Sequence, residues 1–324
     1  MARMSFAYIL SVLMVAVAAC SGGERAATTT TSNATNHHPP RATVALITHQ
    51  APGDTFWDLV RRGAEAAAAK DDIDLQSHDP DATAQADLVR SAVSGRVAGI
   101  AVTLANPLVM VPAVQSAVAA GIPVVAVNSG MTAWKAMGAM EYFGQDEAIA
   151  GQAAGERFTH EGARNVLCVI HEPGHVGLEA RCDGVARGFT GQTQKLYVNG
   201  VDNATVKRAV TARLQQDFSI DRILTLGAQM ALAAREAVAE ANSYARVATF
   251  DTNAGVVDAI NKGMIEWAID QQPFLQGYLA VDSLWLYFTN KNVIGGGQAT
   301  LTGPSFVDDT NIKSVAHLAE AGTR

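Results

Sequence analysis

The sequence predicts an α/β fold made of two doubly wound parallel-sheet domains. From Thr43 onward, short apolar runs rich in β-branched residues alternate with longer alanine-rich segments of helical period, which is the pattern of parallel sheets covered by helices on both faces. A short extended stretch between Ala139 and Gln145 interrupts the alternation. The chain has 324 residues, more than one compact core usually accommodates. These observations favour two consecutive sets of βα units.

The apolar runs predict the strands, and the alanine-rich segments between them predict helices. Strands are expected over residues 43–48, 73–78, 99–103, 124–128, 165–170, 194–199, 222–226, 247–251 and 265–271. No internal repeat is sharp enough to call the two halves duplicates, so the similarity between them is one of architecture.

The N-terminal residues have the layout of a secretory signal peptide. Arg3 precedes an apolar run from Phe6 to Ala19, and this run is too short for a transmembrane helix of about 20 residues. It closes on Ala18-Ala19-Cys20, which resembles the lipobox of bacterial lipoproteins, whose cysteine is lipidated. We therefore expect residues 1–19 to be removed and Cys20 to anchor the protein outside the cytoplasm, at the cell membrane. The alternative is an ordinary signal peptide followed by a chance cysteine.

The segment after the signal peptide and the overall charge limit the classes of partner that are expected. Residues 20–42 hold almost nothing apolar and are expected to form a flexible tether. The net charge is −7, which argues against nucleic acid because phosphate neutralisation needs a clustered basic surface. No second long apolar run follows the signal, so the mature protein is expected to be soluble apart from its anchor.

Two cysteines remain once Cys20 is assigned to the lipid. Cys168 lies in an apolar run, and Cys182 is expected near the start of a helix close by in sequence. Because an exported protein folds in an oxidising compartment, we predict a disulfide between them. The alternative is two buried free thiols.

Polar residues follow almost every predicted strand. In doubly wound sheets, ligands bind outside the carboxyl ends of the strands. The residues there are His49, His78, Asp79, Thr103, Asn128, Ser129, His171, Glu172, Asn199, Asp251, Thr252, Gln271 and Gln272. A polyhydroxylated ligand suits this set, because each hydroxyl both donates and accepts a hydrogen bond. Strand-to-helix loops are polar in any case, and some of these residues are equally expected to cap helices.

Two aromatic residues stand at the expected mouth of the crevice. Phe56 and Trp57 follow Gly53-Asp54-Thr55 directly after the loop of the first strand. Aromatic rings normally cover the apolar C–H faces of a carbohydrate. We expect one ring to face the core and the other to face the ligand, the alternative being helix packing by both.

The same region resembles the ribose-binding-protein group of periplasmic sugar-binding proteins. The opening reads TVALITHQAPGDTFW over 43–57, followed by GAEAA over 63–67. Further matches are AGIPVVAVN at 120–128, GQD at 144–146, RCDG at 181–184, FD at 250–251 and IDQQP at 269–273. The landmarks span roughly residues 43 to 305 in the family's order, although any single motif is weak.

The resemblance implies the type I periplasmic-binding-protein fold, with two domains joined by a three-segment hinge. The N-terminal domain is expected to hold residues 43–145 plus 272–302, and the C-terminal domain 146–271 plus 303–324. The chain is then expected to cross between the domains near 144–146, 271–273 and 302–304.

Carried over position by position, the resemblance also implies a ligand-binding set. Asp54 replaces the family's first-loop amide, Asn128 falls where an aspartate starts an Asp-Arg pair, and Gln271 matches a glutamine at the hinge. The whole set is Asp54, Phe56, Trp57, Asn128, Arg181, Asp251 and Gln271, with His49, Thr103, Ser129, His171 and Glu172 as further candidates from their places at the strand ends.

Two departures from the family pattern bear on the ligand. Asn128-Ser129 replace the Asp-Arg pair, and Gly227-Ala228 replace the Asn-Asp that usually follows the strand at 222–226. Both changes remove hydrogen-bonding reach or charge. We therefore expect a site modified from that of ribose binders, for which a short polyol, a different pentose or another small sugar is as well suited.

One segment has the letters of a zinc-protease motif. His171-Glu172-Pro173-Gly174-His175 matches H-E-x-x-H, which needs a helix to place both histidines on one face. Pro173 and Gly174 oppose that helix. No metal site, no cofactor and no catalytic constellation are expected, so the protein is expected to be a binding protein rather than an enzyme.

The resemblance therefore implies an extracytoplasmic solute-binding lipoprotein, monomeric, that closes on a small sugar or polyol and docks on the permease and ATPase complex of an ABC importer. A sensor that presents a sugar-like signal to a membrane receptor would have the same sequence features. A sugar-responsive repressor of this fold would need a DNA-binding helix-turn-helix where the signal and tether stand.

Overall fold

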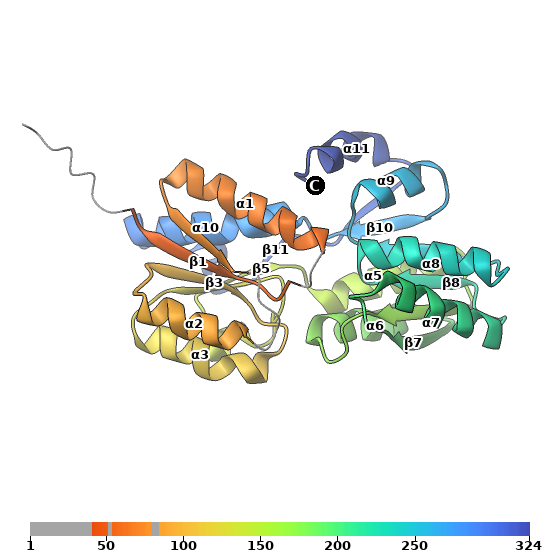
Figure 1. Ribbon diagram of the computed structural model, residues 1–324, viewed down its shortest axis with the longest axis horizontal. Coiled ribbons are helices and arrows are strands. Elements are labelled where there is room, and N and C mark those ends of the chain that lie inside the picture. The colour runs from red at the N-terminus through yellow and green to blue at the C-terminus, as the bar shows by residue number, and fades with distance from the viewer. Residues whose placement is uncertain (1–40, 51–53, 79–83) are drawn as a thin grey trace, which may run out of the picture. The chain divides into compact units, whose positions relative to one another are not determined.

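The computed structural model describes residues 41–50, 54–78 and 84–324, and this part of the chain forms two sheets, each covered by helices on both faces (Figure 1). Some predictions fall outside these residues: the signal peptide, lipidation of Cys20, the tether up to residue 40, and the place of Asp79. None of the helices in the described ranges is long and apolar enough to cross a membrane.

The first domain is built on a six-stranded sheet of order β11-β5-β4-β3-β1-β2, in which every pair is parallel. The strands are β1 (Thr43–Ile47), β2 (Asp74–His78), β3 (Gly99–Thr103), β4 (Val124–Val127), β5 (Glu141–Gly144) and β11 (Thr300–Leu301). The helices are α1 (Thr55–Asp71), α2 (Gln85–Ser94), α3 (Pro107–Ala119), α4 (Trp134–Met137) and α10 (Pro273–Asn290), with a 3₁₀ turn η1 (Ile294–Gly297).

The second domain repeats this order as β12-β10-β9-β8-β6-β7. Its strands are β6 (Asn165–Ile170), β7 (Gln192–Tyr197), β8 (Arg222–Thr225), β9 (Arg246–Phe250), β10 (Trp267–Asp270) and β12 (Ser305–Asp308). Its helices are α5 (Glu147–His160), α6 (Val176–Gly188), α7 (Asn203–Gln216), α8 (Ala228–Glu240), α9 (Ala254–Asn261) and α11 (Ile312–Glu320).

The predicted fold class of two doubly wound domains is confirmed, with one difference at a sheet edge. Strands β6 to β10 take the same places in the second sheet as β1 to β5 take in the first. The difference is β12, which pairs with β10 in antiparallel fashion. A short strand around Thr300 was expected and is β11, whereas β12 was not predicted; its sequence, SFVD, is not a continuous apolar run.

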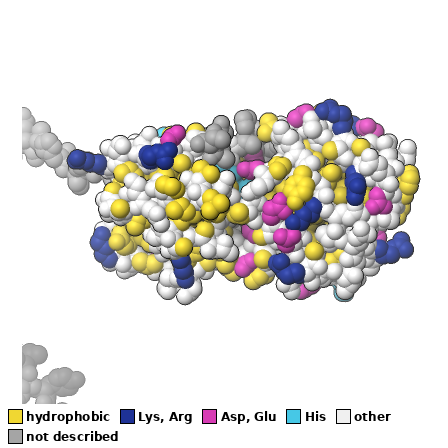
Figure 2. Space-filling model, turned by 90° about the horizontal axis from the view of Figure 1, so that it is seen from below, with side chains coloured by type: hydrophobic (Ala, Val, Ile, Leu, Met, Phe, Trp, Pro, Cys, Tyr) yellow, Lys and Arg dark blue, Asp and Glu magenta, His cyan; other side chains and the backbone are white. Residues whose placement is uncertain are grey.

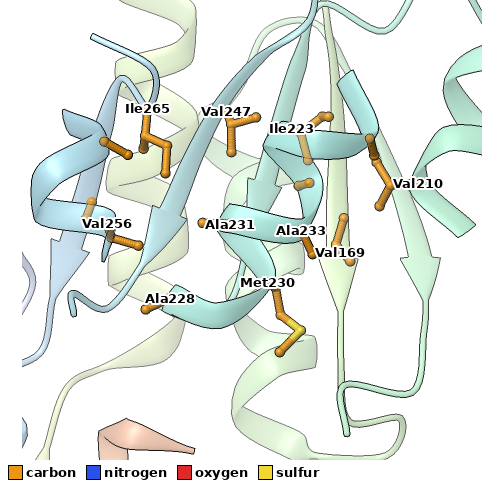
Figure 3. Close-up of a cluster of buried hydrophobic side chains, with 14 of the residues drawn as sticks. Val169, Val210, Ile223, Ala228, Met230, Ala231, Ala233, Val247, Val256 and Ile265 are labelled. Atoms are coloured by element: carbon orange, nitrogen blue, oxygen red, sulfur yellow. The ribbon is translucent and has the colours of Figure 1, made fainter. Parts of the chain in front are cut away.

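The sheets hold their helices through alternate side chains of buried strands. In β1, Val44 and Leu46 pack with α1 and α10, whereas Ala45 and Ile47 pack with α2 and α3. Figure 3 shows the matching layer of the second domain, where strand residues such as Val169 and Val247 meet α8. Strands buried on both faces read as continuous apolar runs, which is why the sequence identified them.

Glycines bring one helix pair of each domain into backbone contact. A Cβ atom at Gly63 of α1 would lie 1.9 Å from the carbonyl oxygen of Phe274 in α10. A Cβ at Gly151 of α5 would lie 2.0 Å from the carbonyl oxygen of Arg181 in α6. Any larger residue at these positions would force the helices apart, and the second contact is used by the site described below.

The predicted disulfide joins β6 to α6. Cys168 lies inside the strand and is bridged to Cys182, with 5.9 Å between their Cα atoms. Helix α6 begins at Val176, so the prediction that Cys182 stands near a helix start was wrong, and the cysteine lies in the middle of the helix. The bridge ties α6 to the sheet on the face opposite α7 and α8.

Replacing Cys168 and Cys182 together by alanine is expected to lower the free energy of unfolding by about 2–3 kcal/mol, because the bridge closes a short loop and restricts the unfolded chain. Urea titration followed by circular dichroism measures the change. Reduced wild-type protein should match the double variant, and a variant as stable as the oxidised protein would contradict the expectation.

Candidate functional site

A cavity of about 580 Å³ lies beside the residues that follow the strands of both sheets. First-domain residues after β1 and β4 line it, together with the start of α1. Second-domain residues after β6, β7, β8 and β9 line the remainder, and Gln271 after β10 completes the wall. The volume is in the range of small-molecule sites.

The structure gathers most of the predicted site residues around this cavity. The lining residues include Asp54, Phe56, Trp57, Asn128, Arg181, Asp251 and Gln271, together with His49, His171 and Glu172. Thr103 and Ser129 do not line it. The hydroxyl of Thr103 lies behind the His49 ring, 2.6 Å from Nδ1. The chain turns at Asn128 (φ 64°), which places Asn128 and not Ser129 in the wall.

Asn128 and Asp251 occupy equivalent places after β4 and β9. Their φ angles are 64° and 66°, in the left-handed region that Asn and Asp tolerate better than other residues with a side chain. Gln271 joins them: Asn128 Nδ2 donates to Gln271 Oε1 at 2.9 Å, and Gln271 Nε2 donates to Asp251 Oδ1 at 2.8 Å. This row links the two domains and fixes the orientation of the Gln271 amide.

Arg181 is buried at the cavity and is paired with Glu147, a residue the sequence analysis missed. Arg181 Nε donates to Glu147 Oε2 at 2.5 Å and one terminal nitrogen donates to Oε1 at 2.9 Å. The other terminal nitrogen donates to the Leu226 carbonyl at 3.1 Å. Burial opposes the charge, but Glu147 outweighs it, and the pKa of Arg181 stands above its ordinary value. Gly151 and Gly184, which allow α5 and α6 to touch, were the available sequence signal.

Three carboxyl groups face the same cavity. Burial raises the pKa of Glu172 to about 7, with a further contribution from Asp54. Burial also raises the pKa of Asp251 to about 7, against the opposing effects of Arg181 and the Gln271 hydrogen bond. The pKa of Asp54 is raised by burial as well. The wall is therefore rich in strong acceptors and disfavours an anionic ligand.

His171 lines the cavity. Its Nδ1 is buried and has no hydrogen-bond partner among the described residues. Burial, and then the nearby Arg181, lower the pKa of His171 to about 4, so the ring is neutral at pH 7. A Cβ atom at Gly227 would lie 3.3 Å from the His171 ring. The glycine that departs from the family pattern thus leaves room for this histidine.

Phe56 and Trp57 both line the cavity and both are largely buried, and the expectation that one ring faces the core and the other the ligand stays a prediction. The two rings meet edge to face with centroids 4.9 Å apart, and Trp57 also contacts the His49 ring at 4.6 Å. They are placed by the start of α1, where Asp54 Oδ1 accepts a hydrogen bond from the Phe56 N–H at 2.9 Å. The aromatic pair packs only with Val60 as a small cluster of its own.

The zinc-protease letters do not form that motif. The chain turns between β6 and α6, and no helix runs through His171 to His175. The structure instead brings His175 close to Glu172 and His49, with donor atoms within 4.8 Å of one another. His175 Nδ1 accepts the N–H groups of Gly177 and Leu178 at 3.0 and 3.4 Å. The ring proton is therefore on Nε2, the nitrogen that faces His49, so this arrangement does not fit a metal ion.

Known proteins resemble this chain in sequence and in fold. The sequence profile of a family described as periplasmic binding protein domain matches residues 44–292. A solved carbohydrate transporter from Acidothermus cellulolyticus 11B, in complex with myo-inositol, is 56% identical, with a TM-score of 0.86 over 88% of this chain and 100% of that chain. A periplasmic sugar-binding protein of an ABC transporter from Legionella pneumophila is 26% identical, with a TM-score of 0.74 over 81% and 100%. The xylose/arabinose-binding protein XylF of Sulfolobus acidocaldarius is 25% identical, over 85% of this chain and 73% of that protein.

Replacing Glu147 by glutamine is expected to lower the free energy of unfolding by about 3–5 kcal/mol, because the buried Arg181 charge loses its partner. Urea titration of the ligand-free protein measures the loss. The control is Asp258→Asn, which breaks an exposed ion pair with Lys262 and should leave the midpoint almost unchanged. A loss at Glu147 no larger than the control's would contradict the role of the pair.

Proposed function

Because the chain belongs to the periplasmic binding protein family, we propose that it captures a small neutral sugar or cyclic polyol, with myo-inositol as the first candidate, in the cavity between its two domains. The observation that carries the proposal is the cavity wall, which combines carboxyl acceptors, a buried arginine and an aromatic pair. The myo-inositol complex of the 56% identical protein supports the choice of ligand.

The wall has a partner for each part of such a ligand. Carboxylates accept hydrogen bonds from hydroxyl groups, and Asp54, Glu172 and Asp251 all line the cavity. Arg181 has five N–H groups, and its bonds to Glu147 and Leu226 use three of them, which leaves two to donate to ligand oxygens. His171 Nδ1 is a further acceptor or donor. Phe56 and Trp57 supply the apolar surface that the C–H face of a ring needs.

We further propose that binding works by hinge closure, with domain boundaries at 145/146, 271/272 and 302/303. Thr302 lies among the crossings: its N–H donates to the Gly144 carbonyl at 2.7 Å, and its carbonyl accepts from Gln272 Nε2 at 2.6 Å. A ligand that contacts both domains has a higher affinity for the closed form and so shifts the population toward it.

Location and partners follow from the family and from the predicted anchor. We propose that Cys20 carries a lipid and that the closed protein docks on the permease and ATPase complex of an ABC importer. Mass spectrometry of membrane-extracted protein should find an N-terminal peptide that begins at Cys20 with added acyl mass. An unmodified Cys20, or cleavage elsewhere, would refute the anchor.

A thermal-shift screen against myo-inositol, C4 to C6 polyols, pentoses and hexoses is expected to show strong stabilisation by one or a few of these compounds. A ligand at 100 times its dissociation constant stabilises the folded form by about 2.7 kcal/mol. Phosphorylated and acidic sugars should fail because the cavity wall is acidic. Failure of every neutral sugar and polyol would contradict the proposal.

Calorimetry with the best ligand then tests the site. Asp251→Asn is expected to weaken binding by about 10- to 100-fold, because hydrogen bonds to a charged group contribute about 1.5–3 kcal/mol. Asp258→Asn, on the exposed side of α9 in the same domain, is the matched control and should bind as wild type does. Equal affinity of the two variants would remove Asp251 from the site.

A further inference from the structure

A hydrogen bond between two buried histidines joins the two domains at the cavity. His49 follows β1 in the first domain and His175 caps α6 in the second. Their Nε2 atoms lie 3.2 Å apart, and the side chains are almost fully buried. Beside them, the Val176 N–H donates to the Ala105 carbonyl at 3.4 Å. The loop after β3 and the start of α6 therefore meet at this point.

The surrounding hydrogen bonds allow one arrangement of the protons. His175 Nδ1 accepts from the backbone of α6, so its proton is on Nε2 and is donated to His49. His49 Nε2 must then accept, which puts the His49 proton on Nδ1, where it is donated to Thr103 Oγ1 at 2.6 Å. Thr103 is held in turn by Gln85 Nε2 at 2.7 Å. A directional chain thus runs from the N-terminus of α6 to β3.

This chain uses every ring nitrogen of both histidines. Neither ring has a nitrogen left for a ligand, in contrast to His171, whose Nδ1 is unpaired. The chain also requires both rings to be neutral, because a proton added to either would point one N–H at another or displace the cap of α6.

The groups around the pair shift the pKa values of the two histidines in opposite directions. Burial, and then His171, lower the pKa of His49 to about 3. Burial, His49, Arg181 and His171 hold the pKa of His175 well below its usual value. The Glu172 carboxyl lies within 4.8 Å of both rings and favours protonation when it is ionised. Trp57 covers the His49 ring and carries no charge.

We propose that His49 and His175 form a latch, a hydrogen bond made only when the domains close, which adds to ligand affinity without binding the ligand. The proposal rests on the proposed hinge closure. It assigns a positioning role to His175, which the sequence did not identify, and to His49, which the sequence placed in the ligand-binding set.

Two asparagine variants remove the latch and keep the local structure. His175→Asn retains a side-chain oxygen able to cap α6, but its side chain is too short to reach His49. His49→Asn places an amide nitrogen near the Nδ1 position, where it still faces Thr103, and removes the acceptor at Nε2. His49→Gln keeps an amide oxygen near Nε2 and is the conservative variant.

Calorimetry and stopped-flow release should be measured with myo-inositol, or with the best binder of the screen. Each asparagine variant is expected to weaken binding about 3- to 10-fold, the value of one hydrogen bond, through faster release. The double variant should be no weaker than either single one, because both remove the same bond. His49→Gln should recover part of the loss.

The pH dependence provides a readout that a purely structural role would not move. In the open form the rings regain the usual histidine pKa of about 6.5, whereas in the closed form the pKa of His49 is about 3. Lowering the pH from 7.5 to 5 protonates the open form, which must then lose a proton to close, so wild-type affinity falls. The ratio of the double variant's dissociation constant to that of wild type should fall to one or below.

Several results would overturn the latch. Additive losses in the double variant, no loss at pH 7.5, or a ratio independent of pH would each do so. Stabilisation by added Zn²⁺ that disappears in the double variant would show a metal site instead. If wild type binds no sugar or polyol, the proposed function fails, but the latch can still be tested by small-angle scattering of ligand-free protein. The double variant should then have a larger radius of gyration than wild type at pH 7.5. Equal radii would overturn the latch.

Discussion

The buried charge of Arg181 is the constraint on which the second domain's half of the cavity depends. A guanidinium out of water needs a partner, and Glu147 supplies it from the first turn of α5. The two side chains reach each other because Gly151 and Gly184 let α5 and α6 touch at the backbone, and the Cys168–Cys182 bridge ties α6 to β6. The charge so placed favours ionised Asp251 and disfavours protonated His171. Helix packing therefore sets the electrostatics of the cavity.

The sequence predicted what depends on local pattern and missed what depends on distant partners. The strands were identified because runs such as 165–170 are apolar throughout, and the rule that ligands bind at the carboxyl ends of strands then gathered Asn128, Asp251 and His171 at one place. Glu147 and His175 were not assigned to the site, because each acts through a residue far away in sequence: Glu147 through Arg181, and His175 through His49. The orientation of Phe56 also depends on a partner, since its ring is placed against Trp57 by the capped start of α1.

The repeated topology shows how equivalent positions acquire different roles. His49 follows β1 and His171 follows β6, strands that hold the same place in their sheets. Thr103, at the end of β3, lies behind His49 and accepts a hydrogen bond from its Nδ1. At the end of β8, Thr225 is engaged with Thr249 instead, at 2.7 Å, and Gly227 opens space beside His171. His49 is therefore fixed by hydrogen bonds at both ring nitrogens, whereas Nδ1 of His171 has no hydrogen-bond partner among the described residues.

In the proposed hinge closure, two features of the cavity wall have opposite effects on closing when no ligand is present. Closing the empty cavity removes water from Asp54, Glu172 and Asp251, and the raised pKa values of these groups express that cost. The histidine pair favours closure in the same state. A neutral ligand with several hydroxyl groups shifts the balance toward the closed form. Each hydroxyl that donates a hydrogen bond to a carboxylate replaces a lost water without adding charge. An anionic ligand would add repulsion at the same step. In the proposed mechanism, the acidic wall makes closure depend on a hydroxyl-rich ligand, and the contacts between the domains hold the closed form once that ligand is inside.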